Sequence, residues 1–349
     1  MLAKLTIFDF SLFSRAKMRF VNGLNVIIGE NSTGKSHLLK LAYVVSALQS
    51  ETARNQPSKL NYRLDERIAE KLVAVFRPEH LGGLVNRKAG RNRALVDAGF
   101  HDHSLRFSFA PNSRKKVALE EHVPAQTARD SVLLPPKEAL SLFPSLIGSY
   151  ERREMVMDET YYDLCRKFLA SPLKPAQLEP VEDLVRDLET ILQGKIILDQ
   201  GRFLVKTPDK GRLEIGLLAE GLRKIAQLAY LLLNGSLRKG CTLFWDEPDC
   251  NLNPKLIRKV AGALVATAGF GIQVVMATHS LFLLRELELL TRGSPLATLY
   301  TGLECRNSGV ISRQAAEIED LPSLIALEEE LDQSDRYLEM HSEQTGPAI

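Results

Sequence analysis

Apolar residues along this chain gather in short runs that turn residues separate. Three of these runs, at residues 24–28, 241–245 and 274–277, contain few polar residues. Short continuous apolar runs bounded by turns are typical of strands that are buried on both faces, as in a parallel sheet. A looser alternation of apolar and polar positions over residues 1–20 predicts a two-stranded hairpin before the first run.

Helical periodicity fills the space between these runs. The apolar face from Val181 to Leu192 follows Pro180 and stops at Gly194, which are a start and a stop typical of a helix. Strands that alternate with helices indicate an α/β protein with a parallel sheet. The other predicted helices cover residues 36–49, 64–76, 225–233, 254–268, 281–290 and 321–338. Further strands are predicted within 80–125 and at 195–199, 202–206 and 212–215. Residues 50–62, which contain Pro57, are predicted to be a connection, and the proline-bearing segment 132–138 is predicted to lead into more helix.

Composition indicates an ordinary globular protein of 349 residues, with 45% apolar and 25% charged residues. The net charge is +2, from 45 basic and 43 acidic residues, so a contact with nucleic acid would have to come from local patches. Four scattered cysteines without a CxxC pair argue against a zinc site or a disulfide framework and favour a reducing cytosol. The N-terminus lacks a secretory signal, and the apolar run 226–233 is too short to span a bilayer. We expect a cytoplasmic protein without a membrane partner.

The first apolar run leads into residues 29–36, which read GENSTGKS. This sequence fits the pattern G-x-x-x-x-G-K-S between a strand and a helix, which is the context in which the pattern binds phosphate. Glycines let backbone N–H groups point at phosphate oxygens, and the helix N-terminus adds a positive dipole. Lys35 would reach the β- and γ-phosphates and Ser36 would offer its hydroxyl to Mg²⁺. The alternative is a plain turn; the predicted nucleotide-binding residues are Gly29, Glu30, Asn31, Ser32, Thr33, Gly34, Lys35, Ser36 and His37.

Two adjacent carboxylates, Asp246 and Glu247, follow the second apolar run. A buried strand that ends in acids delivers them to the carboxyl edge of the sheet, where ligands bind in open α/β folds. Asp246 would hold Mg²⁺, and Glu247 would orient and deprotonate the attacking water. The alternative is a strand that simply ends in acids at the surface.

The third apolar run ends at His279, which lies 32 residues after Glu247 across one predicted helix. This spacing suits a β-α-β unit and would place the two strands side by side. His279 would then hydrogen-bond the γ-phosphate or the attacking water. The alternative is a surface histidine. A weaker pattern, residues 218–224, shows a helix N-terminus with an acid, a glycine and two bases.

Together these four pieces resemble an ABC-class ATPase head. They are most similar to AAA-type core ATPases related to RecF and to the ATPase domain of OLD-type (overcoming lysogenisation defect) nucleases. Residues 5–31 resemble the first strands and the Walker A loop, 246–254 the Walker B and D-loop, 277–280 the switch histidine, and 218–221 the signature loop. The four occur in the family's order and cover roughly residues 1–50 and 195–305.

The resemblance implies a P-loop NTPase of the ABC type that uses ATP and Mg²⁺ and hydrolyses ATP. ATP would lie between the two copies of a homodimer, with the loop of Ala219, Glu220 and Gly221 from one copy capping the γ-phosphate bound by the other. The chain departs from the family at Ala219, where the signature has serine, and at Ser11, where DNA-repair relatives often have arginine. A Q-loop glutamine is not evident, and the segment at 135–138 would take its place. Hydrolysis is therefore expected to be slow or to need a partner.

The spacing of the motifs predicts an ATPase core split into residues 1–50 and 195–349, with an inserted mixed α/β lobe at 51–194. The insertion lacks the heptad run of the coiled coils in chromosome-scaffold proteins. About 50 residues follow Tyr300, too few for the nuclease domain of OLD-type proteins, so a separate effector protein would supply such chemistry.

The leading functional hypothesis is a dimerising ATPase that acts on DNA or with an effector protein, in phage defence by family analogy. The alternatives are a RecF-like DNA-repair clamp and, less favoured, the energy subunit of a transporter. Basic clusters at 87–93 and 114–116 are candidate DNA contacts, weighed against solvated loops. Aromatic residues do not interleave with these bases, which weakens the case for single-strand stacking.

Overall fold

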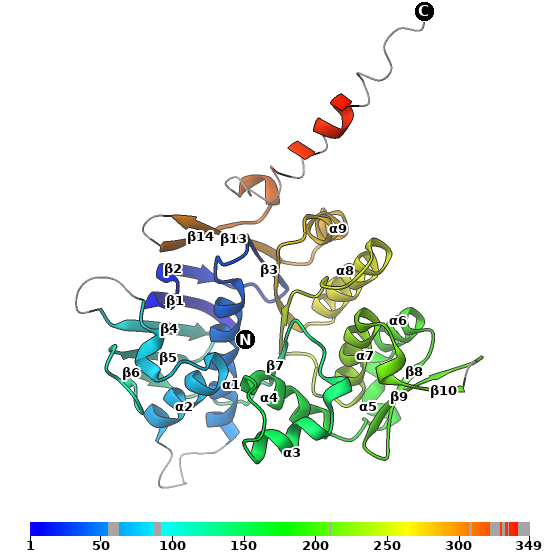
Figure 1. Cartoon of the computed structure of the whole chain (residues 1–349), viewed down its shortest axis with the longest axis horizontal. Helices are drawn as coiled ribbons and strands as arrows, with labels where there is room; N and C mark the ends of the chain where they lie inside the picture. The colour runs from blue at the N-terminus through cyan, green and yellow to red at the C-terminus, as the bar shows by residue number, and fades with distance from the viewer. Residues whose placement is uncertain are drawn as a thin grey trace, which may run out of the picture.

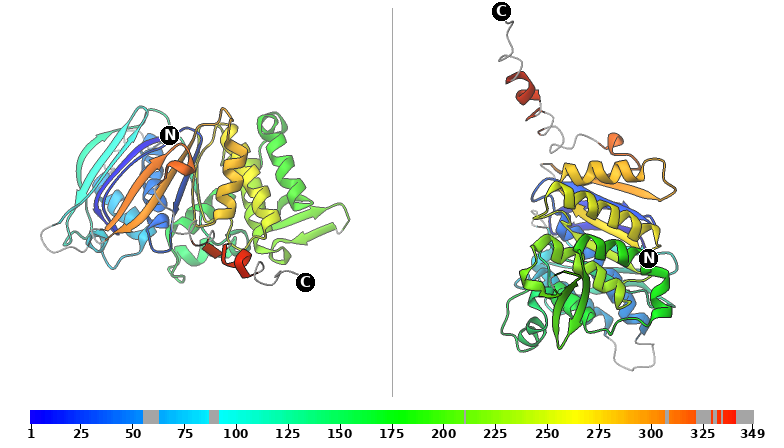
Figure 2. Two further views of the ribbon diagram at one scale, coloured as in Figure 1. Left: turned by 90° about the horizontal axis from the view of Figure 1, so that it is seen from above. Right: turned by 90° about the vertical axis from the view of Figure 1, so that its right-hand side faces the viewer.

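The computed structural model describes residues 1–54, 63–86, 92–209, 211–306, 309–321, 329, 332–333 and 335–340. Its centre is an eleven-stranded sheet with the strand order β6-β5-β4-β1-β2-β14-β13-β3-β12-β11-β7 (Figure 1). A second sheet of three strands, β10-β9-β8, lies at the opposite end of the molecule from β4–β6 (Figure 2).

The strands of the main sheet are β1 Leu2–Phe10, β2 Phe13–Arg19, β3 Leu24–Gly29, β4 Ala94–Phe100, β5 Ser104–Phe109, β6 Ala118–Val123, β7 Ser131–Leu134, β11 Thr242–Asp246, β12 Gln273–Thr278, β13 Thr298–Arg306 and β14 Gly309–Ala315. The small sheet contains β8 Lys195–Asp199, β9 Arg202–Thr207 and β10 Gly211–Glu214. The α-helices are α1 Lys35–Arg54, α2 Leu64–Phe76, α3 Ser145–Glu151, α4 Glu159–Phe168, α5 Pro175–Leu178, α6 Glu182–Leu192, α7 Glu220–Leu233, α8 Pro254–Gly269 and α9 Leu281–Thr291.

A parallel block, β13-β3-β12-β11-β7, forms one half of the main sheet. Its strands are buried on both faces because alternate residues enter two different cores. Trp245 belongs to the core with α6–α9, whereas its neighbour Phe244 belongs to the core with α1 and α2. Figure 1 accordingly shows α1 on one side of β3 and β7, and α7, α8 and α9 on the other. Burial on both faces explains why these strands read as continuous apolar runs.

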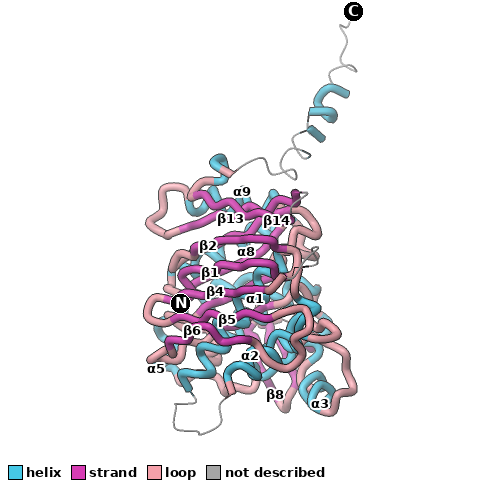
Figure 3. The backbone as a smooth tube through the Cα atoms, turned by 90° about the vertical axis from the view of Figure 1, so that its left-hand side faces the viewer, coloured by secondary structure: helices cyan, strands magenta, loops and turns pink. Residues whose placement is uncertain are grey.

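The other half of the sheet contains the antiparallel strands β1, β2, β4, β5 and β6. Figure 3 shows them as successive rungs below β13 and β14. Phe10 of β1 packs edge-on against Phe76 of α2 and Phe109 of β5, at 5.4 and 6.3 Å between ring centroids. These contacts fix the start of the chain and α2 to the same core that covers α1.

Most predicted elements are present within a residue or two of their predicted bounds, and α2 matches its prediction at both ends. Helix α1 continues to Arg54, so the predicted connection at 50–62 begins too early. The proline-bearing segment 132–138 was not expected to hold a strand, yet Ser131–Leu134 forms β7 at the sheet edge, parallel to β11. Pro135 and Pro136 follow this strand directly and end it.

The inserted lobe predicted at 51–194 does not stand apart as one unit. Its strands β4, β5, β6 and β7 all pair into the main sheet with the core strands. Helix α2 packs against α1 in one core, whereas α3–α6 share the other core with α7 and the small sheet, and α6 contacts both α7 and α8. The division into core and lobe stays a prediction, but the main sheet crosses its boundary at residue 50.

Two predictions fall largely outside the described residues: the basic cluster at 87–93, of which 92–93 are described, and the helix at 321–338. In the part of the chain that the structure describes, every helix is too short or too polar to traverse a bilayer.

Candidate functional site

The phosphate-binding pattern lies where β3 ends and α1 begins. The backbone turns sharply at Ser32 (φ +67°) and Gly34 (φ +87°), and Leu38 N–H donates to the Gly34 carbonyl at 2.9 Å to start the helix. A Cβ on Gly34 would lie 3.0 Å from the Phe13 ring, so both the left-handed φ and the close ring favour glycine here. The loop therefore places the N-terminus of a 20-residue helix at the carboxyl edge of the sheet.

Lys35 reaches back over this loop. Its ammonium group donates to the carbonyl oxygens of Gly29 at 2.7 Å and Glu30 at 2.8 Å, and the residue is 6% exposed. Burial lowers the pKa of Lys35, while Glu247 and Asp246 act in the opposite direction. The lysine therefore lies within electrostatic reach of both carboxylates at the end of β11.

Asp246, the last residue of β11, is 2% exposed and accepts a hydrogen bond from the Ser36 hydroxyl. Burial raises the pKa of this carboxyl above its usual value, against the effects of Ser36, Lys40 and Lys35. Its Oδ1 atom is buried and lacks a hydrogen-bond partner among the described residues. A buried carboxylate oxygen beside a hydroxyl is a donor set that suits Mg²⁺, which one or two protein oxygens and substrate phosphates usually hold.

Glu247 and His279 face each other across the ends of β11 and β12. The Nδ1 atom of His279 lies 3.0 Å from Oε1 of Glu247. Glu247 has a left-handed backbone (φ +47°), which is uncommon for a residue other than glycine, and its N–H donates to the Ala277 carbonyl at 2.9 Å. The 32-residue spacing thus places the two strands side by side, as predicted.

The predicted signature loop lies at the start of α7 and contacts residues 251–252 of the same chain. Glu220 accepts a hydrogen bond from the Asn251 amide at 2.9 Å. A Cβ on Gly221 would lie 1.9 Å from a methyl group of Leu252, so the leucine side chain lies directly against the glycine. Ala219 is the N-cap of α7 and lacks a side-chain cap hydrogen bond.

The structure brings Lys35, Ser36, Asp246, Glu247 and His279 to one edge of the sheet. His37 differs, because its ring lies 2.5 Å from the Ser11 hydroxyl and packs edge-on against Phe76. Only its backbone N–H remains for a phosphate role. Burial also lowers the pKa of His37. Ser11 thus contacts a side chain of the helix that follows the phosphate loop.

Sequence reasoning missed the contacts behind the acids. Lys224 of α7 donates to the carbonyl oxygens of Glu247 and Cys250, at 3.0 and 3.1 Å. Thr278 donates to Asp249 at 2.8 Å. The apolar spacing of α7, with Leu228 and Leu231 one and two turns after Lys224, was the available signal that this lysine is buried.

A second missed contact lies where β7 ends, near the expected Q-loop. Arg223 forms an ion pair with Glu138 at 3.0 Å, and Gln227 accepts a hydrogen bond from Ala139 N–H at 2.9 Å. Glu138 is 6% exposed. This segment is therefore tied to α7 through a buried carboxylate.

The basic cluster at 114–116 is partly neutralised. Lys116 pairs with Asp65 and Glu66, at 3.5 and 3.1 Å. Arg152 pairs with Glu154 at 2.8 Å. Exposed pairs of this kind contribute little to stability, and they also reduce the positive charge that a nucleic acid would meet. A DNA contact stays a prediction.

Comparison with protein families identifies the chain. The model of a family described as "AAA domain, putative AbiEii toxin, Type IV TA system" matches residues 84–285, which is more than half of the sequence. The chain belongs to this AAA domain family. The range that matches the AAA model begins after the phosphate loop and includes Asp246, Glu247 and His279. Membership confirms that this AAA protein is an ATPase, as the motifs predicted.

The chain is also similar to a short part of a curated protein and, in its fold, to solved structures. The chain is 38% identical over 53 residues to the DNA replication and repair protein RecF of Bacillus velezensis, a match that covers 15% of this chain and 14% of that RecF. The crystal structure of an Smc head bound to the C-winged-helix domain of ScpA has a TM-score of 0.55 at 14% identity and covers 91% of this chain and 98% of that one. The SMC head of Thermotoga maritima has a TM-score of 0.49 at 14% identity, over 90% and 98% of the two chains.

The likeness to the Smc head confirms the predicted fold, an α/β P-loop head of the ABC type. The family match confirms that the chain is an AAA-domain ATPase, and the 53-residue match shows that part of it is similar to RecF. A relation to OLD-type nucleases stays a prediction, and so does each residue's role.

Proposed function

We propose that this ATPase binds Mg·ATP at the carboxyl edge of β3, β11 and β12 and hydrolyses it with Glu247 as general base. The observation that carries the proposal is the convergence of Lys35, Asp246 and Glu247. These side chains come from two distant segments, and the Ser36–Asp246 and Glu247–His279 hydrogen bonds link them.

Each side chain has a role that its position supports. The Lys35 ammonium, now on loop carbonyls, turns to the β- and γ-phosphates when they occupy the loop. Glu247 accepts the proton of the attacking water, and the hydrogen bond to His279 holds its carboxylate in one orientation. Ser36 and Asp246 would hold Mg²⁺, which neutralises the charge of the phosphates when it is bound.

We further propose that two copies enclose each ATP. In this arrangement Ala219, Glu220 and Gly221 of one copy cap the γ-phosphate that the other binds, and ATP stabilises the dimer by mass action. Ala219 offers no hydroxyl, so its contact with the phosphate is through backbone N–H at the start of α7. The ABC-type fold supports this proposal.

The biological role follows from what the relatives are called. The family's description includes a type IV toxin–antitoxin system, which supports action together with a second protein. The proposed role in phage defence rests on family analogy. The RecF match favours a second candidate, a DNA-repair clamp whose ATPase sets its residence time on DNA. Stimulation of turnover by duplex DNA alone, without a partner, would favour the clamp. We place the protein in the cytoplasm.

The test is the substitution Glu247→Gln, with Glu120→Gln on the exposed strand β6 as control. We expect ATP binding to persist and turnover to fall by about 10²–10⁴-fold, the usual contribution of a general base, because the amide cannot accept the water's proton. In the Glu247→Gln protein, light scattering should report a dimer with ATP and a monomer without it. Unchanged hydrolysis would reject Glu247 as the base, and a monomer in saturating ATP would reject the shared site.

A further inference from the structure

A buried lysine that the mechanism above does not use lies directly behind the catalytic edge. Lys224, in the second turn of α7, is 1% exposed. Burying an ammonium group is costly unless hydrogen bonds satisfy it, so a lysine in such a place needs a reason. Burial lowers the pKa of Lys224, while Cys250, Asp249, Glu220 and Glu247 oppose this effect.

The partners of Lys224 are two backbone carbonyls of the turn after β11. Its Nζ atom donates to the Glu247 oxygen at 3.0 Å and to the Cys250 oxygen at 3.1 Å. The Glu247 carbonyl also accepts from Cys250 N–H at 3.2 Å. The lysine therefore closes a tight turn that begins at the proposed general base.

This turn holds strained backbone. Glu247 has a φ of +47°, in the region that residues with a side chain rarely adopt, and Asn251 has +64°, which asparagine tolerates better than most residues. Such conformations persist only where the surroundings fix them. Glu247 is fixed on both sides, because its N–H donates to Ala277 of β12 and its carbonyl accepts from Lys224. The two bonds together set the direction in which the Glu247 carboxylate leaves the backbone.

Residues in the first turn of α7 contact the same segment. Glu220 bonds Asn251, and Gly221 lies against Leu252 so closely that a Cβ would overlap it. Arg223 joins α7 to Glu138 at the end of β7. The start of α7 and the turn 247–252 are therefore joined by several direct contacts.

From these contacts we infer that Lys224 is a positioning residue, which holds the general base Glu247 in its reactive orientation and makes that orientation depend on the place of α7. This inference rests on the proposed function, because it takes Glu247 as the base. The loop Ala219–Gly221 lies at the start of α7. A second copy that contacts this loop would therefore change the orientation of Glu247 through Lys224.

The test compares Lys224→Met, which keeps the length of the side chain and removes the donor, with Lys259→Met on the exposed face of α8 as control. We expect kcat to fall about 10–100-fold, the scale of a misplaced catalytic group, while the Kd for ATP changes less than about threefold. Lys259→Met should match the wild type in both. A folded Lys224→Met protein with unchanged kcat, or with kcat and affinity lost in parallel, would overturn the inference.

A double substitution separates this inference from the proposed function. If Lys224 acts through Glu247, Lys224→Met should cost little more turnover in the Glu247→Gln background, whereas independent effects would multiply. Multiplying effects overturn the positioning role alone, while full activity of Glu247→Gln by itself overturns the proposed function. If thermal unfolding shows that Lys224→Met is not folded, Lys224→Gln, which keeps an N–H donor, takes its place. We then expect an intermediate loss of kcat, and an unchanged kcat would contradict the inference.

Discussion

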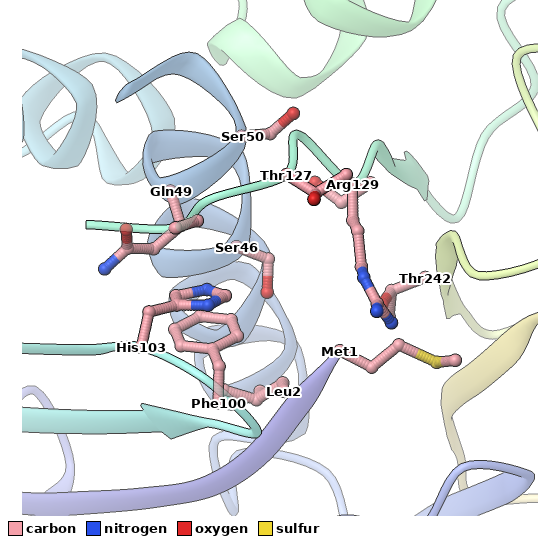
Figure 4. A pocket seen from close by; sticks show the side chains of 12 residues that line it. Met1, Leu2, Ser46, Gln49, Ser50, Phe100, His103, Thr127, Arg129 and Thr242 are labelled. Carbon is pink, nitrogen blue, oxygen red and sulfur yellow. The ribbon is translucent and has the colours of Figure 1, made fainter. Parts of the chain in front are cut away.

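The two ends of strand β11 both carry polar groups, but they differ in what those groups do. At the carboxyl end lie Asp246 and Glu247. At the amino end Thr242 lines a small cavity with Ser46, Gln49 and Ser50 of α1 and His103 beside β5 (Figure 4). Polar side chains therefore gather at both ends of the strand, and their presence alone does not identify a site.

At the amino end most of these groups bond near neighbours. Thr242 donates to Gln273 at 3.1 Å, Gln49 to the Ser104 carbonyl at 3.2 Å, and His103 lies 2.8 Å from Asp102. At the carboxyl end, Lys35 and two carboxylates converge beside a helix N-terminus. Buried oxygens without a partner among the described residues occur at both ends, so they do not separate the two regions. Convergent charge at a helix start, rather than polarity, distinguishes the site from the cavity.

The strongest test of this difference is Lys35→Ala against Arg129→Ala, which removes a cation from the amino-end cavity. We expect the Kd for ATP to rise about 10–100-fold for Lys35→Ala, because charge-assisted bonds to phosphate contribute about 1.5–3 kcal/mol. Fluorescence titration with a labelled nucleotide measures it. Arg129→Ala should leave the affinity for ATP unchanged. An affinity of Lys35→Ala equal to that of the wild type would show that the two ends of β11 do not differ in this way.

The carboxyl end was also the better predicted of the two. Strands β3, β11 and β12 are buried on both faces, so each shows as an apolar run whose end marks the sheet edge. Strand β7 has only four residues and is followed by two prolines, so its local pattern is too short to separate it from a loop. Its place beside β11 depends on pairing across more than 100 residues, which no local pattern encodes.

The same reason explains the domain boundary and the missed lysine. Strand β4 pairs with β1 across about 90 residues, so the local sequence near residue 94 does not indicate that β4 extends the core sheet. The helical spacing of α7 indicates that Lys224 is buried, but only the fold shows that its partners are the carbonyls after β11. Sequence pattern predicts which residues are buried, whereas the hydrogen-bond partners of a buried polar group are set by tertiary contacts.

An intermediate effect is expected for Asp246→Asn in the absence of Mg²⁺ and nucleotide. Removing a desolvated carboxylate should raise the free energy of unfolding by about 1 kcal/mol, because the site is arranged for its ligand rather than for stability. Burial raises the pKa of Asp246, so the native state holds the proton more tightly and wild-type stability falls as the pH rises through that pKa. The advantage of the variant should therefore be larger at pH 7.5 than at about pH 3.5, which is below the ordinary pKa of an aspartate carboxyl.

Urea unfolding in EDTA at the two pH values measures this difference. Thr242→Ser, at the other end of β11, is the matched control and should show the same pH dependence as the wild type. An advantage of Asp246→Asn that shrinks as the pH rises would mean that the carboxylate is stabilised in the empty site, contrary to the geometry.

The smallest expected effect concerns Ser131 in the amino-end cavity, whose buried hydroxyl lacks a hydrogen-bond partner among the described residues. Ser131→Ala should raise the free energy of unfolding by about 0.5–1 kcal/mol, because it removes an unsatisfied buried group. Thr242→Val should lower it by about 1 kcal/mol, since it leaves Gln273 without its donor. Thermal unfolding and ATPase turnover are measured together, and turnover should not change in either variant. A several-fold loss of turnover in Ser131→Ala would show that the two ends of the parallel strands are coupled, and the cavity would then have to be counted as part of the site.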